Sequence, residues 1–130
     1  MNEVYEFLKS AETYYLATME GNQPRVRPFG TVAIFEDKLY IQTGKEKNVS
    51  KQLHINSKAE ICAMKDGSWI RIASTLIADN RIEAKQNMLD DYPELQDMYS
   101  AEDENTEVWY LTNAKATINS FNQDTVEINF

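Results

Sequence analysis

Two runs of strand-like sequence, Lys58–Lys65 and Ser68–Ile77, are separated only by Asp66-Gly67. Asp-Gly is a strong signal for the two-residue turn that joins neighbouring antiparallel strands in a hairpin. Within the second run, Arg71 and Ile72 must point to opposite faces because successive strand side chains alternate. The pattern therefore predicts an antiparallel sheet with one apolar face and one more polar face.

The remaining chain continues this pattern of short strands with a few helices. Apolar spacing of three and four residues predicts helices, and β-branched or aromatic runs predict strands. We expect further strands at 13–19, 23–35, 38–43, 108–111, 114–121 and 126–130, and helices at 2–11, from about 45–48 to 55, and at 80–99 in two pieces divided by Pro93. The 130 residues fit one domain, so residues 1–130 are predicted to form a single, mainly β, antiparallel barrel with flanking helices.

Several classes of protein are disfavoured by composition. No apolar run approaches the roughly 20 residues that a membrane-spanning helix needs. The N-terminal sequence lacks the basic start and apolar block of a signal peptide, and Cys62 is the single cysteine, so we expect a cytoplasmic protein without an internal disulfide. With Cys62 and His54 as the sole residues of their types, no zinc site is predicted, and Cys62 is expected to lie in the core.

The charge is distributed unevenly along the chain. The net charge is −8, yet residues 21–58 contain seven Lys or Arg and three Asp or Glu. An acidic remainder repels nucleic acid and anionic membranes, whereas a confined basic segment suits one small anion. The alternative is that this segment is an ordinary solvated basic surface.

The basic stretch itself, LYIQTGKEKNVSKQL, runs from a strand that ends near Thr43 into a helix. The first N–H groups of a helix have no intrahelical partner and favour an anion. The Thr43 hydroxyl can add a donor, Lys47 and Lys51 lie one helical turn apart, and Arg25 and Arg27 come from a neighbouring strand. This set of groups predicts a site for a phosphate monoester.

Other interpretations remain open for these residues. Lys47 and Lys51 can simply be exposed helix lysines, while the two arginines pair with the acidic segment at 90–104. The sequence contains no glycine-rich dinucleotide loop, and neither Ser68 nor Ser74 has a plausible histidine partner for a hydrolase triad. His54 is expected to pack near the end of its helix.

Four segments resemble a known family: RVRPFG at 25–30, LYIQTGKEKNVSKQL at 39–53, SWIRI at 68–72 and EVWYLTNAKATINSF at 107–121. In this order they are similar to the small flavin-binding split-barrel proteins related to pyridoxamine 5'-phosphate oxidase. The resemblance implies an antiparallel split β-barrel that forms a homodimer, with FMN in grooves at the dimer interface. Many relatives carry glycine near the position of Ser74, so the backbone of this strand is expected to differ here.

The resemblance also implies roles for individual residues. Along the isoalloxazine ring it places Arg25, Val26, Arg27 and Pro28. Beside the flavin and its ribityl-phosphate tail it places Gln42 and Thr43. The phosphate is assigned to Lys47, Asn48, Lys51 and Gln52. Trp69 and Arg71 are expected to approach the partner's flavin, and Trp109 is a weaker candidate for the same pocket.

The function implied is that of an FMN-dependent oxidoreductase. It would take a hydride from reduced nicotinamide or another donor and pass electrons to a small acceptor, such as a nitroaromatic or a quinone. The main alternative is a flavin carrier or sensor without turnover. A third hypothesis, a barrel that binds single-stranded nucleic acid through Lys45–Lys51 and Tyr40, is disfavoured by the acidic remainder. Oxidation of pyridoxamine phosphate is not expected, because the sequence lacks the C-terminal arginine and histidine with which the oxidase of this family binds that substrate.

Overall fold

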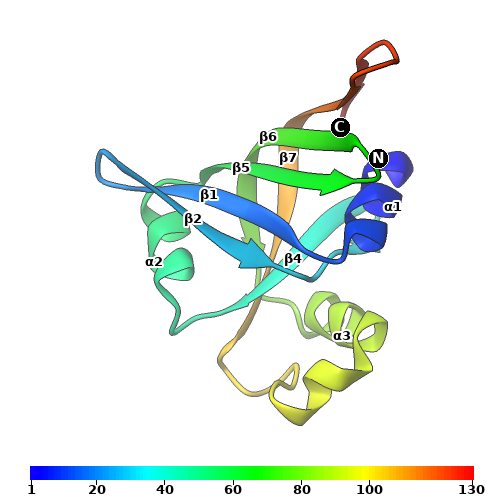
Figure 1. Cartoon of the computed structure of the whole chain (residues 1–130). Helices are drawn as coiled ribbons and strands as arrows, with labels where there is room; N and C mark the ends of the chain where they lie inside the picture. Colours follow the sequence, from blue (N-terminus) through cyan, green and yellow to red (C-terminus); the bar gives the residue numbers. More distant parts are fainter.

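The strands of the protein form one strongly curved antiparallel sheet in the order β2-β1-β5-β6-β7-β4-β3, with β8 paired to β7 (Figure 1). This is a computed structural model, and it describes residues 1–130. The strands are β1 Tyr14–Glu20, β2 Gln23–Phe29, β3 Ala33–Phe35, β4 Lys38–Gly44, β5 Lys58–Lys65, β6 Ser68–Asp79, β7 Thr106–Ser120 and β8 Val126–Asn129. The helices are α1 Asn2–Ala11, α2 Asn48–Ile55, α3 Ile82–Asp91 and the short 3-10 helix η1 Pro93–Asp97.

The hairpins predicted from turn residues are confirmed. Asp66 and Gly67 have φ values of 52° and 77°, the left-handed conformation that a tight hairpin turn requires. β5 and β6 pair on either side of this turn, from Lys65 opposite Ser68 to Lys58 opposite Thr75. The antiparallel barrel-like architecture with outlying helices is therefore the predicted fold class.

Residues 23–35 form two strands rather than the single strand predicted. β2 pairs with β1, whereas β3 pairs with β4 at the opposite end of the sheet order. Between them, the Tyr14 hydroxyl donates a hydrogen bond of 2.6 Å to the Thr31 carbonyl, and the Tyr92 hydroxyl contacts both backbone groups of Val32. The two tyrosine hydroxyls thus provide hydrogen-bond partners for backbone groups of the segment that connects β2 to β3.

The two strands predicted around Asn113 are one continuous strand, β7. Asn113 has a φ of 48°, and the register against β6 shifts between Ala73 and Thr75. At this bulge Ser74 donates a hydrogen bond of 2.8 Å from its hydroxyl to the Thr112 carbonyl. A bulge bends its strand and increases the local twist, so this point lets the long β6–β7 pair curl around the core.

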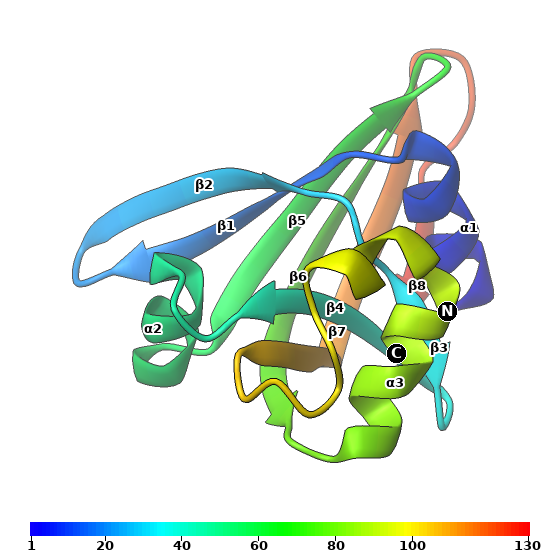
Figure 2. The same ribbon diagram turned by 90° about the horizontal axis from the view of Figure 1, so that it is seen from below.

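The core fills the concave side of the sheet. It contains fully buried side chains from β1, β5 and β6, including Leu16, Ile61 and Ile72, and α1 adds Val4 and Leu8. Seen from below in Figure 2, the helices lie on one side, and the outer side of β1, β2 and β5 carries no helix. One face of this part of the sheet is therefore open.

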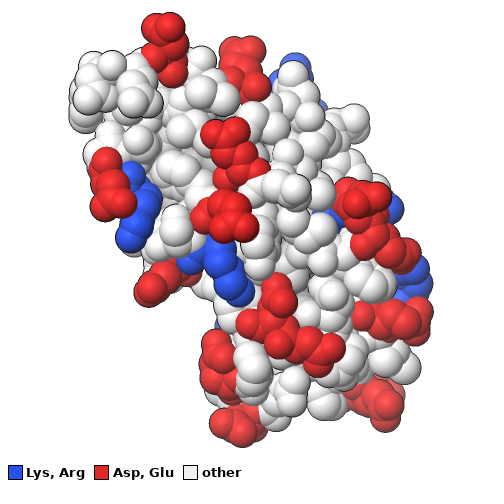
Figure 3. Space-filling view, turned by 90° about the vertical axis from the view of Figure 1, so that its right-hand side faces the viewer, with Lys and Arg blue, Asp and Glu red and all other residues white.

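Two surface features accompany this fold. Acidic side chains gather in the lower part of Figure 3, which is the part of the molecule that contains α3 and the segment after it. None of the helices combines the length and the apolar character needed to cross a bilayer. On the face that Figure 3 shows, acidic side chains extend from the upper edge to the part around α3, in keeping with the acidic composition.

A buried carboxylate fastens α3 to the sheet. Asp79, 8% exposed, accepts hydrogen bonds from the Tyr40 hydroxyl at 2.7 Å and from Arg81 Nη2 at 2.9 Å. The Arg81 guanidinium lowers the pKa of Asp79 to about 2, with Tyr40 adding to the effect against the opposing effect of burial. This cluster joins β4 and β6 at the start of α3.

We predict that Asp79→Asn lowers the free energy of unfolding at pH 7 by about 1–3 kcal/mol, because the Tyr40 and Arg81 donors lose a charged acceptor. Asp79 has a pKa below its unfolded value of about 3.9, so its contribution is present above that pH and is lost as the pH falls toward 2. Urea unfolding between pH 2 and 7 measures both effects. The same change at exposed Asp97, whose side chain makes no hydrogen bond, is the control; equal curves for both variants would contradict the prediction.

Candidate functional site

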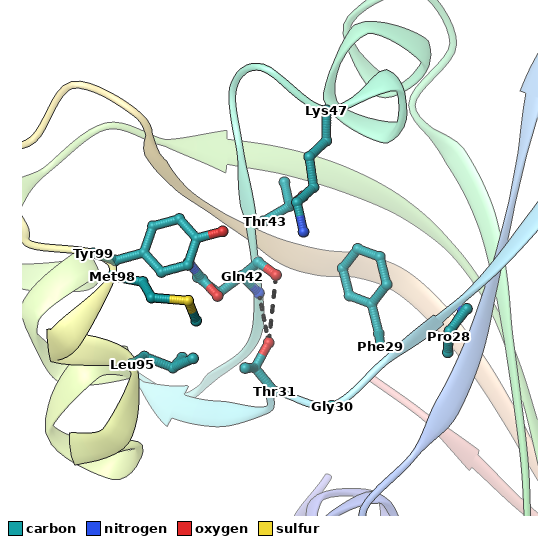
Figure 4. A pocket seen from close by; sticks show the side chains of 10 residues that line it. All are labelled: Pro28, Phe29, Gly30, Thr31, Gln42, Thr43, Lys47, Leu95, Met98 and Tyr99. Carbon is teal, nitrogen blue, oxygen red and sulfur yellow. Dashed lines mark hydrogen bonds between the residues drawn. The ribbon is translucent and has the colours of Figure 1, made fainter.

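A cavity of about 210 Å³ opens where the end of β4, the turn after β2, the start of α2 and the segment after α3 meet (Figure 4). Its polar wall comes from β4 and from the turn before α2, and its apolar wall comes largely from the segment after α3. The residues that line it are Pro28, Phe29, Gly30, Thr31, Gln42, Thr43, Lys47, Leu95, Met98 and Tyr99.

Two residues that line this cavity each carry a buried polar atom without a hydrogen-bond partner. Gln42 Nε2 and Thr43 Oγ1 are the buried side-chain nitrogen and oxygen atoms of the protein that lack one. The backbone around them is satisfied, since the Thr31 hydroxyl accepts from the Gln42 N–H at 3.1 Å. Leaving a buried polar group unpaired costs about 1–3 kcal/mol, so two such groups on neighbouring residues of the cavity lining make this cavity the candidate site for a polar ligand.

Lys47 adds a positive charge to the same cavity. It is the N-cap of α2, with an extended backbone, and no side chain caps the helix start. Figure 4 shows its side chain directed toward the space between Thr43 and Phe29. The free N–H groups at a helix start carry partial positive charge, so the end of the cavity lined by Thr43 and Lys47 lies next to the positive end of α2.

Lys51 lies elsewhere, which differs from the expectation that it shares a face with Lys47. Because Lys47 precedes the helix in an extended conformation, the four-residue helical spacing does not relate the two side chains. Lys51 lines a separate polar hollow of about 490 Å³ together with Lys45, His54, Ser50, Asn80 and Glu107. Asn48, the first residue of α2, is exposed.

Arg25 and Arg27 share one face of β2, as predicted, but neither lines the cavity. Arg27 donates to the Leu16 carbonyl, to Thr18 Oγ1 and, at 2.7 Å, to Gln52 Oε1. Burial lowers the pKa of the Arg27 guanidinium, although the group keeps these three acceptors. The alternative pairing with the acidic segment at 90–104 is wrong, since Arg25 forms an exposed ion pair of 2.8 Å with Glu20.

Gln52 therefore belongs to a polar anchor rather than to the cavity wall. Its side chain is buried, and its Oε1 also accepts a 2.6 Å hydrogen bond from the Thr18 hydroxyl. The anchor joins the β1–β2 hairpin to the middle of α2. Gln52 and Arg27 thus hold in place the helix whose first residues border the cavity.

A second anchor, which the sequence analysis missed, holds the other side of α2. Glu107 in β7 is 1% exposed; its carboxylate accepts hydrogen bonds from Ser50 and Trp109, both at 2.7 Å, and lies 2.9 Å from His54 Nε2. Desolvation raises the pKa of Glu107, but the hydrogen bonds from Ser50, His54 and Trp109 lower it by more. Trp109 is consequently a core residue away from the cavity, and His54 packs at the helix end as expected.

Val26, Trp69 and Arg71 lie on the open outer face of the sheet. The cross-strand register forms a row on this face from Pro28, at the cavity rim, through Tyr15 and Cys62 to Arg71. The prediction that Cys62 lies in the core is wrong: Ile61 and Ala63 point inward, so the alternation of the strand exposes Cys62.

The apolar cavity wall formed by Leu95, Met98 and Tyr99 was also missed. These residues follow Pro93, in a segment expected to be helical and acidic. Their spacing of three and four residues within that acidic run is the signal that a helical turn presents them together. Sequence reasoning thus identified Pro28, Gln42, Thr43 and Lys47 but not the residues that face them.

Comparison with known proteins places this geometry in context. The family model described as pyridoxamine 5'-phosphate oxidase matches residues 1–129. A search of curated proteins found no match.

Solved structures share the fold over nearly the whole chain. A NimC/NimA family protein from Clostridium acetobutylicum has 41% identity and a TM-score of 0.97, covering 100% of this chain and 92% of that one. A pyridoxamine 5'-phosphate oxidase-related, FMN binding protein from Nostoc punctiforme has 15% identity and a TM-score of 0.60, covering 97% and 90%.

A heme binding protein from Mycobacterium smegmatis has 12% identity and a TM-score of 0.69, covering 94% of this chain and 57% of that one. The two more distant likenesses show the fold alone. Since the family model covers all but the last residue, the chain belongs to the pyridoxamine 5'-phosphate oxidase family.

Proposed function

We propose that the protein binds FMN in the cavity beside β4 and α2 and acts as an FMN-dependent oxidoreductase. The observation that carries the proposal is that two residues lining that cavity, Gln42 and Thr43, each hold a buried side-chain atom without a partner, Nε2 and Oγ1 respectively. A hydroxyl donor, the Lys47 ammonium and free helix amides are the groups that a phosphate monoester needs. Membership of the family and the FMN-binding relative support the same choice.

The chain's own residues would bind and orient the cofactor. Thr43, Lys47 and the first amides of α2 would hold the phosphate, and Pro28 with the wall after α3 would border the ring. FMN supplies hydride and electron transfer when bound, while the protein supplies position and electrostatics. The proposed reaction moves electrons from reduced nicotinamide or another donor to a small acceptor, such as a nitroaromatic or a quinone.

The fold also accommodates heme in a relative, but the position of the histidine favours FMN here. His54 is the single histidine of the chain, and it lies in the hollow that contains Lys51, against Glu107 and the Trp109 ring. The cavity itself therefore has no imidazole to serve as an axial ligand. Its donors suit a phosphate instead.

A flavin carrier or sensor is the second candidate function. Lys47 and Tyr99 are the titratable residues that line the cavity, and no carboxylate or imidazole faces it as a general acid or base. Hydride transfer through a flavin does not require such a group, so the same wall suits an enzyme and a carrier. Turnover separates the two.

We also propose that the protein forms a homodimer through the open outer face of β2, β1, β5 and β6. This face exposes large apolar side chains: Tyr15 is 51% exposed, Met64 66% and Val26 67%. Exposed apolar side chains that share one sheet face mark an interaction surface. Because the row of residues on it begins at Pro28 on the cavity rim, a partner docked there would border the cofactor site.

The first prediction concerns the unpartnered hydroxyl. Thr43→Val keeps the side-chain shape, so it should leave the cofactor-free protein equally or more stable while weakening FMN binding by about 1–2 kcal/mol, the usual size of a lost hydrogen bond. Thermal unfolding without cofactor and fluorescence titration with FMN measure the two effects. Thr117→Val, on β7 away from the cavity, is the matched control and should bind FMN normally. Unchanged FMN affinity in Thr43→Val would contradict the proposed site.

Turnover provides the second prediction. The FMN-loaded protein should oxidise reduced nicotinamide in the presence of a nitroaromatic or quinone acceptor, at a rate proportional to the bound flavin. Steady-state absorbance of the nicotinamide measures this, with free FMN at the same concentration as control. A stable flavoprotein that remains inactive with several donors and acceptors would favour the carrier.

The third prediction tests the dimer. Val26→Glu places a charge on the proposed interface and should shift the protein from dimer to monomer in light scattering coupled to size-exclusion chromatography. Val126→Glu makes the same substitution on β8, outside this face, and should remain dimeric. A dimeric Val26→Glu protein, or a monomeric wild type at micromolar concentration, would contradict the proposed interface.

A further inference from the structure

The two walls of the cavity come from separate segments that no hydrogen bond joins directly. One wall includes Lys47 and depends on the turn from Gly44 to Lys47. The other wall is carried by Met98 and Tyr99, and Figure 4 shows these side chains on the opposite side of the cavity from Lys47. Something must fix the distance between these segments if the cavity is to keep a defined shape.

Asp103, in the loop between η1 and β7, contacts both segments through one carboxylate. Its Oδ1 accepts the N–H groups of Asn105 at 2.9 Å and Thr106 at 2.7 Å. Its Oδ2 accepts the N–H group of Ser100 at 3.0 Å and the Thr106 hydroxyl at 2.9 Å. Desolvation raises the pKa of Asp103, but the hydrogen bonds lower it by more, to about 2, so the group is a carboxylate at neutral pH.

On the first wall, Asn105 transmits this constraint to the turn before α2. Its carbonyl accepts the Lys45 N–H at 2.8 Å, and its Oδ1 accepts the Glu46 N–H at 3.3 Å. Its side chain also packs on Gly44, where an added Cβ would lie only 3.1 Å from Nδ2. Asn105 therefore fixes the backbone that leads directly to Lys47.

On the second wall, Asp103 holds Ser100, the residue that follows Tyr99. The contact is reciprocal, because the Asp103 N–H donates to the Ser100 carbonyl at 3.3 Å. The peptide group next to Tyr99 is thus closed into a turn on the same carboxylate that orders Asn105. Glu102 and Glu104, its acidic neighbours, make no comparable side-chain contact.

We propose that Asp103 is a positioning residue of the cofactor cavity, which holds the Lys47 wall and the Tyr99 wall at a fixed separation through Asn105 and Ser100. The identity of the ligand rests on the proposed function, but the positioning itself does not. Asp103 does not line the cavity and would act through the two segments it joins.

The test compares Asp103→Asn with Asp97→Asn in the full chain. Both substitutions remove one negative charge. Only at position 103 does the new amide nitrogen replace a carboxylate oxygen that accepts hydrogen bonds, because the Asp97 side chain accepts none. In the absence of cofactor, amide hydrogen exchange at residues 45–46 and 100 should be faster in Asp103→Asn than in Asp97→Asn. Unchanged exchange at these amides would overturn the proposal.

With FMN, Asp103→Asn should bind about tenfold more weakly, the effect of losing one charge-assisted hydrogen bond. The visible circular dichroism of bound flavin at saturation should also change, because the ring would lie between displaced walls. Asn105→Ala should weaken binding as well, and the double variant should show less than the sum of the two effects, since both act through one chain of contacts.

These measurements separate the possible failures. Faster exchange in Asp103→Asn with wild-type FMN affinity and an unchanged flavin spectrum would reduce Asp103 to a loop-stabilising residue and overturn the proposal. Faster exchange in a protein whose wild type binds no FMN would leave the positioning role intact and would refute the proposed function instead.

Discussion

The placement of α2 is the constraint on which the candidate site depends. Two buried polar anchors hold this eight-residue helix from opposite sides: Arg27 reaches Gln52 from the β1–β2 hairpin, and Glu107 reaches Ser50 and His54 from β7. A buried charge is tolerated when hydrogen bonds or opposite charges compensate it; the buried Glu107 carboxylate accepts from Ser50 and Trp109 beside His54, and the half-buried Arg27 donates to three acceptors. The helix start, and Lys47 with it, is thereby fixed relative to the end of β4.

Against this well-satisfied background, the unpaired atoms of Gln42 and Thr43 stand out. The other buried side-chain nitrogen and oxygen atoms of the protein have partners, so the two unpaired ones both belong to residues that line one cavity. Proteins depart from local consistency chiefly at functional sites. The same interpretation explains why an acidic protein keeps Lys47 beside these atoms: the local donors and charge face a ligand, whereas the surrounding acidic surface faces solvent.

Much of the architecture was predictable from sequence, because its signals are local. Asp66-Gly67 specified the hairpin, and the change of period after Thr43 located α2. The failures have a common cause, since they concern which partner a segment meets. Residues 23–35 were predicted as one strand because the sequence does not show that their two halves pair with different neighbours. The sequence likewise did not show that Arg27 donates hydrogen bonds to Thr18 and Gln52. Asp103 was not singled out from the acidic segment at 90–104, because its role depends on backbone donors across a loop.

The most direct test of the central claim is a crystal structure of the protein grown with FMN. The account predicts the phosphate within hydrogen-bonding distance of Thr43 Oγ1 and Lys47 Nζ, at the start of α2, with the ring beside Pro28. Density for the phosphate in the hollow formed by Lys45, Lys51 and His54, with the Thr43 hydroxyl still unpartnered, would contradict it.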